Sequence, residues 1–425
     1  MKRREFFEKT GIGTAGILAS GFGAISCQDN NSNEIKLPKK PVDFEAIRND
    51  FPALKKFQAY LDTAFVGLIP NQVKIAHEKF LNDRLNFGPF PEHNSILGIW
   101  MRKMEELREK TASFLGAKNN EIAFTLCTGC GSNIAINGIK WRKGDNAVID
   151  DLEYPTDFHI LNALKKRGVD VRIARNKNGY VSPENFEALT DKRTRAYVVS
   201  HVSYLNGFKH NLRKLADIIH SFKGYLIVDG AQSIGGINVN VKHEDVDFMS
   251  GIPYKWLNGP NGLGFLYVHE RCIPDFEPDR LGWASTNDFI SMETMESNPL
   301  PESAKKFEYG TLSFEGIYAM DTALDYINQI GIDIIEKRNL NFVNTIYNTL
   351  ANKGFKFFTP IENGSPIISV YVSNENKIKT ELRKKGIYLT ARRLNKGYLR
   401  ISPHFYNNEN DINNFLDAFE NLSNI

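Results

Sequence analysis

The chain has few cysteines, little net charge and no long apolar run. Only four of its 425 residues are cysteine, too few for a disulfide scaffold. Fifty-three Lys and Arg residues stand against 50 Asp and Glu, a net charge of +3 that gives no electrostatic reason to expect a nucleic-acid partner. Beyond the N-terminal segment, no stretch reaches the ~18 uninterrupted apolar residues of a membrane span. With 42% apolar residues, the chain is expected to fold into two or three globular units.

Cys127 and Cys130 form a C-x-x-C motif. No second Cys or Cys/His pair at zinc spacing accompanies this motif, so the sequence predicts no metal site. Packing of small residues is therefore favoured over a metal or redox role for the pair.

The first 27 residues are typical of an export signal. The sequence KRREFFEK at positions 2–9 precedes a short, Gly-rich apolar stretch over 11–26, a pattern similar to a twin-arginine signal. AISC, which ends at Cys27, resembles a lipobox, so Cys27 either carries a lipid anchor or lies incidentally near a simple cleavage site. Residues 28–40 form a polar tether. We expect an exported protein, either periplasmic or a membrane-anchored lipoprotein.

From about Pro41 onward the pattern is that of a continuous α/β protein. Short apolar runs alternate with helix-like segments such as 158–167 and 212–222, which predicts a mainly parallel sheet covered on both faces. After about residue 290, helical stretches at 317–330 and 334–352 precede shorter segments and a helix from Glu409, typical of a smaller α+β domain. The predicted strands of the main sheet are 122–126, 146–149, 169–174, 196–200, 225–229 and 264–268.

An acid ends one of the predicted strands. Asp229 closes the apolar part of GYLIVDGAQS (224–233), and Gln232 follows three positions later. Open α/β sheets hold ligands at the C-terminal edge of their strands, and the Gln232 amide can donate there to an anionic oxygen. On its own this pattern fits a structural or metal role equally well.

A lysine follows in SGIPYKWLNGPNG (250–262), between turn-prone residues. Tyr254 and Trp256 flank Lys255 and would desolvate it in part, which lowers the pKa of its amine and makes the amine a nucleophile. Without the surrounding pattern, an ordinary surface lysine would be the default.

The segment TGCGSNIAIN (128–137) follows the first predicted strand and opens an apolar helix. Gly129 and Gly131 let the backbone approach a ligand, while Ser132 and Asn133 supply donors at the helix N-terminus. This arrangement predicts a phosphate seat, with a plain helix cap as the alternative. The segment fits neither the P-loop nor the G-x-G-x-x-G pattern, so a nucleotide is the weaker ligand.

A phosphate seat, an acid–amide pair and a downstream lysine are together what pyridoxal 5′-phosphate requires. Lys255 would carry the cofactor as a Schiff base, Asp229 would keep the pyridinium nitrogen protonated, and the helix terminus would hold the phosphate. The protonated ring is an electron sink for charge at the substrate α-carbon.

Residues 60–411 resemble the class-V aminotransferase family of fold-type I pyridoxal-phosphate enzymes, which includes cysteine desulfurases, isopenicillin-N-epimerase-like proteins and C–S lyases. The resemblance implies a large cofactor-binding domain (76–290) with a mainly parallel, seven-stranded sheet, a smaller C-terminal α+β domain (291–425), and an N-terminal segment (41–75) packed on the small domain. The motifs that carry it, in the family's order, are YLDTAFVGLIP (60–70), TGCGSNIAIN, EYP (153–155), VVSHVSYLNG, VDGAQS, SGIPYKW, FEYGT and LRISPHFYN.

The resemblance also implies roles for single residues. Tyr154 would stack on the pyridine ring and His201 would lie near its hydroxyl side, although core packing and a satisfied strand-end histidine are the respective alternatives. Thr311 would reach the cofactor phosphate of the neighbouring subunit in a homodimer. Arg400 would bind the substrate carboxylate bidentately, unless it is a surface charge. The other implied contacts with the cofactor or substrate are Ala64, Gly131, Ser132, Asn133, Asp229, Gln232, Ser250 and Lys255.

The sequence also departs from the family pattern. Cysteine desulfurases need a nucleophilic cysteine on a loop shortly before the carboxylate-binding arginine, but GIYLTARRL (386–394) contains none, so persulfide chemistry is not expected. Tyr254 precedes the lysine where many relatives carry His. For Arg392 and Arg393 two roles are open: they would bind a second acidic group of the substrate, or they would form a solvated basic turn.

We expect an amino-acid substrate, with the Lys255 amine as general base at the α-carbon. An aminotransferase or epimerase-like activity is favoured. A C–S β-lyase is the alternative, and an exported binding protein without catalysis is a third possibility.

Overall fold

The computed structural model describes residues 41–86, 96–286, 299–360 and 364–422. The predicted export signal and tether (1–40) lie outside these residues. Among the helices of the described ranges, none combines the length and apolarity needed to cross a membrane.

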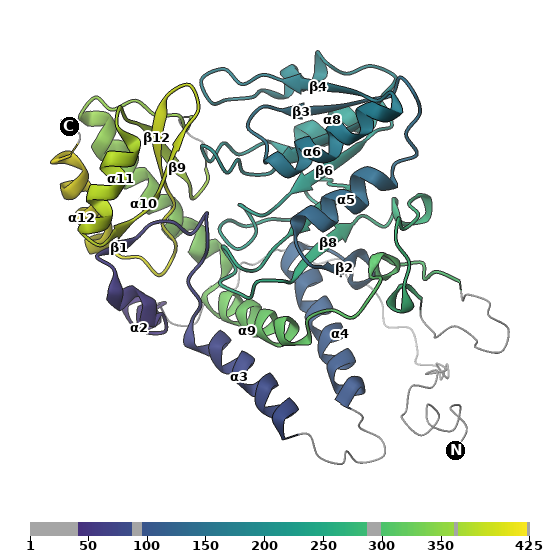
Figure 1. Ribbon diagram of the computed structural model, residues 1–425, viewed down its shortest axis with the longest axis horizontal. Helices are drawn as coiled ribbons and strands as arrows, with labels where there is room; N and C mark the ends of the chain where they lie inside the picture. Colours follow the sequence, from purple (N-terminus) through teal and green to yellow (C-terminus); the bar gives the residue numbers. More distant parts are fainter. Residues whose placement is uncertain (1–40, 87–95, 287–298, 361–363, 423–425) are drawn as a thin grey trace, which may run out of the picture.

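A seven-stranded sheet forms the centre of the molecule (Figure 1). Five of its strands run parallel as neighbours, and β8 is antiparallel to both β2 and β7. The predicted α/β class and mainly parallel sheet are therefore confirmed. In spatial order the strands are β2 (Ile122–Thr125), β8 (Gly264–Val268), β7 (Phe248–Gly251), β6 (Tyr225–Asp229), β5 (Thr194–Ser200), β3 (Asn146–Asp150) and β4 (Asp170–Ala174).

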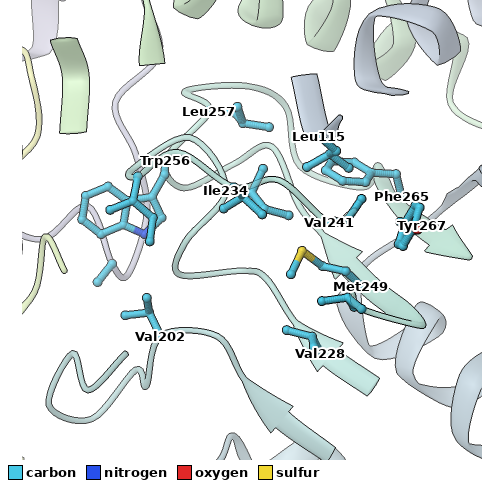
Figure 2. Packing of buried hydrophobic residues seen from close by; sticks show 14 of the residues in the cluster. Leu115, Val202, Val228, Ile234, Val241, Met249, Trp256, Leu257, Phe265 and Tyr267 are labelled. Atoms are coloured by element: carbon cyan, nitrogen blue, oxygen red, sulfur yellow. The ribbon is translucent and has the colours of Figure 1, made fainter. Parts of the chain in front are cut away.

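Both faces of this sheet are covered because its strands are apolar at nearly every position. Adjacent residues of a strand point to opposite faces, so Val228 of β6 belongs to one buried cluster and Ile227 to the other. Helix α8 (Leu212–Ser221) packs on the Val228 face, while α5 (Thr128–Gly138) and α6 (Pro155–Leu164) pack on the Ile227 face. Figure 2 shows the core of the Val228 face, with Met249, Phe265 and Trp256.

Polar side chains mark where several helices begin. Asn211 accepts a hydrogen bond from Lys214 N at the start of α8, and Ser313 accepts one from Gly316 N at the start of α9 (Phe314–Ile330). These caps satisfy backbone donors that the first helical turn leaves free. Pro155 begins α6, where its missing N–H costs nothing.

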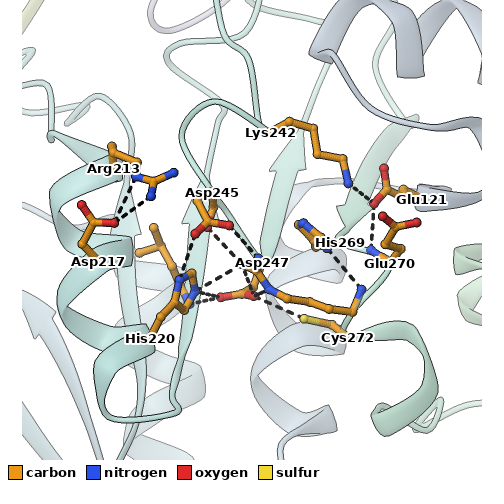
Figure 3. Close-up of polar contacts among 12 residues, drawn as sticks. Glu121, Arg213, Asp217, His220, Lys242, Asp245, Asp247, His269, Glu270 and Cys272 are labelled. Carbon is orange, nitrogen blue, oxygen red and sulfur yellow. Dashed lines mark hydrogen bonds and ion pairs between the residues drawn. The ribbon is translucent and has the colours of Figure 1, made fainter.

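The ends of β6 and β7 away from their carboxyl edge are tied together by a buried acid, Asp247 (Figure 3). Its carboxylate accepts hydrogen bonds from His220 Nε2 at 2.7 Å, Arg271 Nε at 2.8 Å and Leu226 N at 2.8 Å. Cys272 Sγ also donates to it at 3.4 Å. This network fixes the sheet at the edge opposite to the site described below.

A second, smaller unit lies beside the large sheet (Figure 1). Its three-stranded antiparallel sheet has the order β11 (Thr390–Arg393), β12 (Gly397–Ile401) and β9 (Ile368–Tyr371). Its helices are α10 (Ile332–Asn352), α11 (Glu375–Lys384) and α12 (Glu409–Glu420). From the N-terminal segment, β1 (Ala59–Tyr60) pairs in parallel with β10 (Ile387–Tyr388) of this unit.

The packing changes from the large to the small unit later than residue 290. Ile317 of α9 and Ile335 at the start of α10 belong to the core of the large unit, whereas Phe342 of α10 belongs to that of the small unit. Helix α9 packs against α3 (Asn71–Leu85) and α4 (Ile96–Leu115). The composition changes at 290, but the apolar face of α9 is buried with the large unit.

Candidate active site

The predicted acid and lysine lie together at the carboxyl edge of the sheet. Asp229 ends β6, and Lys255 follows β7 in the adjacent loop. Both are buried, with Lys255 only 9% exposed. Burial lowers the pKa of the Lys255 amine to about 8, opposed by the negative charge of Asp229 and reinforced by Arg400 and Arg392. The four groups therefore surround one site.

Asp229 is held in a fixed orientation. Its Oδ1 accepts a hydrogen bond from Ala231 N at 2.7 Å, and its backbone oxygen accepts one from His201 N at 2.9 Å. Among the described residues no hydrogen bond reaches Oδ2. Burial raises the pKa of the Asp229 carboxyl, whereas the Lys255 charge opposes that rise. A cationic ring nitrogen would satisfy Oδ2.

The lysine loop rests on the N-terminal segment. Gly67 N donates to Tyr254 O at 2.9 Å, and Asn258 Nδ2 donates to Leu68 O at 2.7 Å. A Cβ at position 67 would lie 1.9 Å from the Lys255 carbonyl oxygen. Only glycine permits this close approach, so the segment 60–70 positions the lysine backbone.

The start of α5 faces β7, as a phosphate seat requires. Gly131 packs so closely on β7 that a Cβ there would lie 2.3 Å from Ser250 Oγ. The Ser132 side chain is buried, and its hydroxyl lowers the pKa of the nearby Asp157 carboxyl against the larger effect of burial. Asn133 Nδ2 donates to Gly129 O at 2.8 Å, within the helix. Both side chains thus already have partners within the protein. The backbone N–H groups that the first helical turn leaves free are the donors available to an anion.

Aromatic and amide groups surround the space above Lys255. Tyr154 is 42% exposed and meets Tyr204 edge-on, with 5.0 Å between ring centroids. Its exposure excludes the core-packing alternative. Gln232 Nε2 donates to Ala64 O at 2.9 Å, while its Oε1 accepts from Trp256 Nε1 at 2.9 Å. Gln232 therefore joins the N-terminal segment to the lysine loop and retains one N–H for a ligand.

His201 follows β5 and is fully enclosed. Burial, together with the positive charges of Lys209 and His210, lowers its pKa to about 3, so the ring is neutral. Its Nδ1 is buried without a hydrogen-bond partner. A neutral ring with a free nitrogen can serve a ligand by one hydrogen bond. The predicted position near the hydroxyl side of the cofactor ring stays a prediction.

Arg400 of β12 is 1% exposed, so it is not a surface charge. Its Nη1 donates to Tyr204 O at 2.9 Å, and its Nη2 lies 3.3 Å from Asp62 Oδ1. Thr390 Oγ1 donates to the same carboxylate at 2.8 Å. Arg400 Nε is buried and unpartnered. The guanidinium thus keeps a free donor beside a fixed partner, which suits a substrate carboxylate.

The two arginines before Arg400 lie in different environments. Arg393 is exposed, and its Nε donates to the buried carboxylate of Glu375 in the small unit at 2.8 Å. Arg392 lies over the Tyr204 ring, at 5.1 Å from its centroid, and lowers the pKa of Lys255. Its Nε is buried and unpartnered. Arg392 therefore belongs to the site and Arg393 does not.

Sequence reasoning missed several of these groups. Asp62 pairs with Arg400 although 338 residues separate them, and Tyr204 packs between Tyr154 and Arg392. Asp157 is buried near Asp229, and burial together with that charge raises its pKa to about 7. No local pattern marked these residues, because their partners come from distant segments. Asp62 does fall within YLDTAFVGLIP and Tyr204 within VVSHVSYLNG, and these two motifs were the available signals.

Thr311 and the cysteine pair lie at the margin of the site. Thr311 is exposed and lines a small pocket with Leu126 and Cys130 of its own chain. Cys127 is exposed and Cys130 half-buried, so the pair lies outside the buried core. Within the ranges that the structure describes, no group of three His, Cys, Asp or Glu side chains could hold a metal ion.

The fold is that of a fold-type I pyridoxal-phosphate enzyme. The family model for class-V aminotransferases matches residues 59–415. The chain therefore belongs to the class-V aminotransferase family, as its motifs indicated.

Among curated proteins, the chain is 29% identical over 397 residues to a probable cysteine desulfurase of Methanothermobacter thermautotrophicus, covering 89% of this chain and 98% of the relative. It is also 29% identical over 324 residues to a cysteine desulfurase of Escherichia coli, covering 72% and 77% of the two chains. These names give no support to an aminotransferase or epimerase-like activity and lie closer to the C–S lyase alternative.

Two solved structures are similar in fold. Apo cysteine desulfurase from Thermococcus onnurineus superposes with a TM-score of 0.81 at 25% identity, covering 89% of this chain and 98% of that one. The cystine C–S lyase C-DES, in complex with its product cysteine persulfide, superposes with a TM-score of 0.80 at 21% identity, covering 87% and 98%. At that identity the second likeness concerns the fold alone.

Proposed function

We propose that the protein is a pyridoxal-phosphate-dependent C–S β-lyase that acts on a sulfur-containing amino acid with a second anionic group. The buried Lys255–Asp229 pair at the sheet edge and the amides at the start of α5 fit the cofactor. When bound, pyridoxal 5′-phosphate supplies an electron sink for the charge left at the substrate α-carbon. Lys255 would hold the cofactor covalently and Asp229 would keep its ring nitrogen charged.

One observation carries the choice of a lyase. The relatives are named for removing sulfur from cysteine, yet this chain has no cysteine between Gly386 and Arg400, where a desulfurase keeps its sulfur acceptor. Without an acceptor thiol there, the sulfur would leave with its own substituent. The Lys255 amine would take the proton from Cα, the Cβ–S bond would break, and the sulfur would depart as a thiolate that gains a proton.

Two guanidinium groups support the anionic substrate. Arg400 Nε and Arg392 Nε are both buried donors without partners. Arg400 would bind the α-carboxylate, and Arg392 would bind a second carboxylate at the far end of the substrate. L-cystine, with an amino acid on each sulfur, has this form.

The test is to incubate the purified holoenzyme with L-cystine, L-cysteine or L-alanine and to measure pyruvate, ammonia and released thiol or persulfide. A β-lyase yields pyruvate and ammonia in equal amounts, with one sulfur product per turnover. Arg392→Gln should reduce the preference for L-cystine over L-cysteine, whereas Arg393→Gln, on the surface, should not. Formation of alanine with an enzyme persulfide, of the opposite enantiomer, or of keto acid only with an amino acceptor would contradict the proposal.

We also propose that the protein is exported and forms a homodimer. Export is supported by the KRREFFEK sequence at 2–9, and a lipid anchor by Cys27 within AISC. Exposure of Thr311 supports its reaching the cofactor phosphate of the neighbouring subunit. Replacing Arg3 and Arg4 by Lys should keep the protein in the cytoplasmic fraction, and sedimentation should give twice the chain mass.

A further inference from the structure

The C-x-x-C motif lies at the start of α5 with its two sulfurs facing one another. Cys127 is the N-cap residue and Cys130 the third residue of the helix, and their Sγ atoms are 3.6 Å apart. Cys127 O accepts hydrogen bonds from Cys130 N at 3.1 Å and Gly131 N at 3.4 Å. Residues three apart on a helical turn are neighbours, so rotation of the two side chains is enough to bring the sulfurs into bonding distance.

The two thiols are chemically unequal. The hydrogen bond between the two sulfurs lowers the pKa of Cys127 to about 6, although burial opposes the shift. The same contact, with burial, raises the pKa of Cys130. Cys127 is also the exposed member of the pair. An exposed thiolate beside a protonated thiol is the arrangement that reacts with disulfides.

The motif shares its surroundings with the proposed cofactor site. The charge of Asp229 acts on Cys127, and Cys127 acts on the hydroxyl of Tyr254, the residue before Lys255. A Cβ on Gly129 would lie 3.8 Å from Cys127 Sγ. The Cys127 sulfur is therefore close to the backbone of the first turn of α5, where the phosphate is proposed to bind.

We propose that Cys127 and Cys130 form a redox-active dithiol that reacts with disulfide compounds, and that its closure to a disulfide strengthens phosphate binding at the start of α5. The second half of this inference rests on the proposed cofactor site. In the reduced form the Cys127 thiolate places a negative charge beside the first turn of α5, 3.8 Å from a Cβ built on Gly129, and this charge repels an anion bound there. The disulfide is neutral and removes that repulsion.

The reaction balances with a small disulfide as oxidant. The Cys127 thiolate attacks one sulfur of the disulfide, forming a mixed disulfide and releasing one thiolate. Cys130 then gives its proton to that thiolate or to solvent and attacks Cys127 Sγ, which releases the second thiolate. Two electrons pass from the dithiol to the oxidant, and two small thiols leave.

Coupling between the two events is reciprocal. If the disulfide form binds phosphate tenfold more tightly, saturating phosphate must lower the reduction potential of the pair by about 30 mV. For a two-electron couple, a tenfold change in the equilibrium constant corresponds to a change of about 30 mV in potential. Phosphate must likewise raise the apparent pKa of Cys127, measured from the pH dependence of its alkylation rate. Both effects can be measured without turnover.

The experiment equilibrates the apoprotein with reduced and oxidised glutathione at several ratios. Mass mapping of alkylated peptides reports the state of each cysteine, and titrations of each form with pyridoxal 5′-phosphate and with inorganic phosphate report affinity. We expect a 127–130 disulfide and at least tenfold tighter binding of both ligands to the oxidised form. Cys272, buried against Asp247 (Figure 3), should remain a thiol throughout.

Variants separate the two halves of the inference. Cys127→Ser removes the thiolate and should bind phosphate equally, and tightly, at every glutathione ratio. Cys130→Ser keeps the thiolate but cannot close, and should bind weakly at every ratio. Cys272→Ser should keep the full redox response.

Each contrary result has a definite meaning. If the disulfide formed at none of the glutathione ratios, the proposed redox-active dithiol would be wrong. If the two forms bound phosphate with equal affinity, the proposed coupling would be wrong. If pyridoxal 5′-phosphate bound neither form while the disulfide closed, the proposed function would fail. The coupling would then be decided by inorganic phosphate alone.

Discussion

At the scale of single residues, the site depends on charges that are buried before any ligand arrives. Lys255, Asp229 and Arg400 each lose hydration. The charges of Lys255 and Asp229 compensate each other, and Asp62 compensates Arg400. Removing water strengthens their mutual interactions and keeps their donors and acceptors directed at one space. The reactivity of the lysine follows from this arrangement.

The lowered pKa of Lys255 predicts how the apoprotein captures its cofactor. Only the neutral amine attacks an aldehyde, and burial places half-neutralisation at about pH 8 instead of the usual 10.5. The rate constant for capture of pyridoxal 5′-phosphate should therefore rise with pH and level off above about pH 8. Stopped-flow absorbance measures it. Lys255→Ala should give no borohydride-stable label, and a rate still rising steeply at pH 10 would show an unshifted amine.

Replacing Arg400 by Lys tests its role in substrate binding. An ammonium keeps the charge that neutralises Asp62 but cannot make two parallel hydrogen bonds to a carboxylate. Arg400→Lys should raise KM by about tenfold to a hundredfold and change kcat less. Arg393→Lys is the matched control, because Arg393 is exposed and pairs with the buried Glu375 away from the site, and the variant should leave KM unchanged. Steady-state kinetics distinguish the two. Equal KM values in wild type and Arg400→Lys would contradict carboxylate binding.

At the scale of elements, two segments from opposite ends of the chain hold the lysine loop. Residues 60–70 contact it through Gly67 and Leu68, and His404 Nε2, beyond β12, bonds to Trp256 O at 2.8 Å. The loop has no regular secondary structure of its own. Its geometry is imposed by these contacts.

Gly67→Ala tests that support. The added methyl would lie 1.9 Å from the Lys255 carbonyl oxygen, a backbone atom that cannot rotate away. Overpacking of this kind costs about 1–3 kcal/mol, and the shift falls on the lysine. We expect a lower unfolding midpoint and slower cofactor capture. Gly310→Ala, whose Cβ meets nothing within 4 Å, should unfold like the wild type. Denaturant titration compares them, and equal midpoints for both variants would mean that the loop moves freely.

The sequence predicted elements better than it predicted contacts. Apolar runs marked most strands of the main sheet, such as β6 ending at Asp229. Strand β7 (Phe248–Gly251) was not recognised, because four residues that include Ser and Gly carry no period. Asp229, Lys255 and Arg400 were found through motifs, whereas Asp62 and Tyr204 act through partners far along the chain. Such pairs form only when segments far apart in the sequence meet in the fold.

At the scale of the whole molecule, the junction between the two units is buried and polar. Asn339 Nδ2 of α10 donates to Gly236 O of the large unit at 3.0 Å and lies 3.2 Å from His404 Nδ1. Both side chains are fully buried. A buried polar group costs stability when its partner is lost, so this junction makes the two units unfold together.

The same junction makes stability depend on pH. Burial lowers the pKa of His404 to about 3, although the hydrogen bond to Trp256 O opposes the shift. Unfolded histidine titrates near 6.5, so between pH 6.5 and 3 the unfolded chain binds a proton that the folded chain excludes. Stability is then lost as pH falls, by about 1.4 kcal/mol per pH unit from this residue.

His404→Gln should be less stable than the wild type at pH 7. As pH falls, however, its free energy of unfolding should decrease by about 1.4 kcal/mol less per pH unit than that of the wild type. Urea titrations between pH 4 and 7 give both slopes. His243→Gln, at an exposed position, should keep the wild-type slope, and parallel slopes for His404→Gln would mean that the folded protein accepts a charge at the junction.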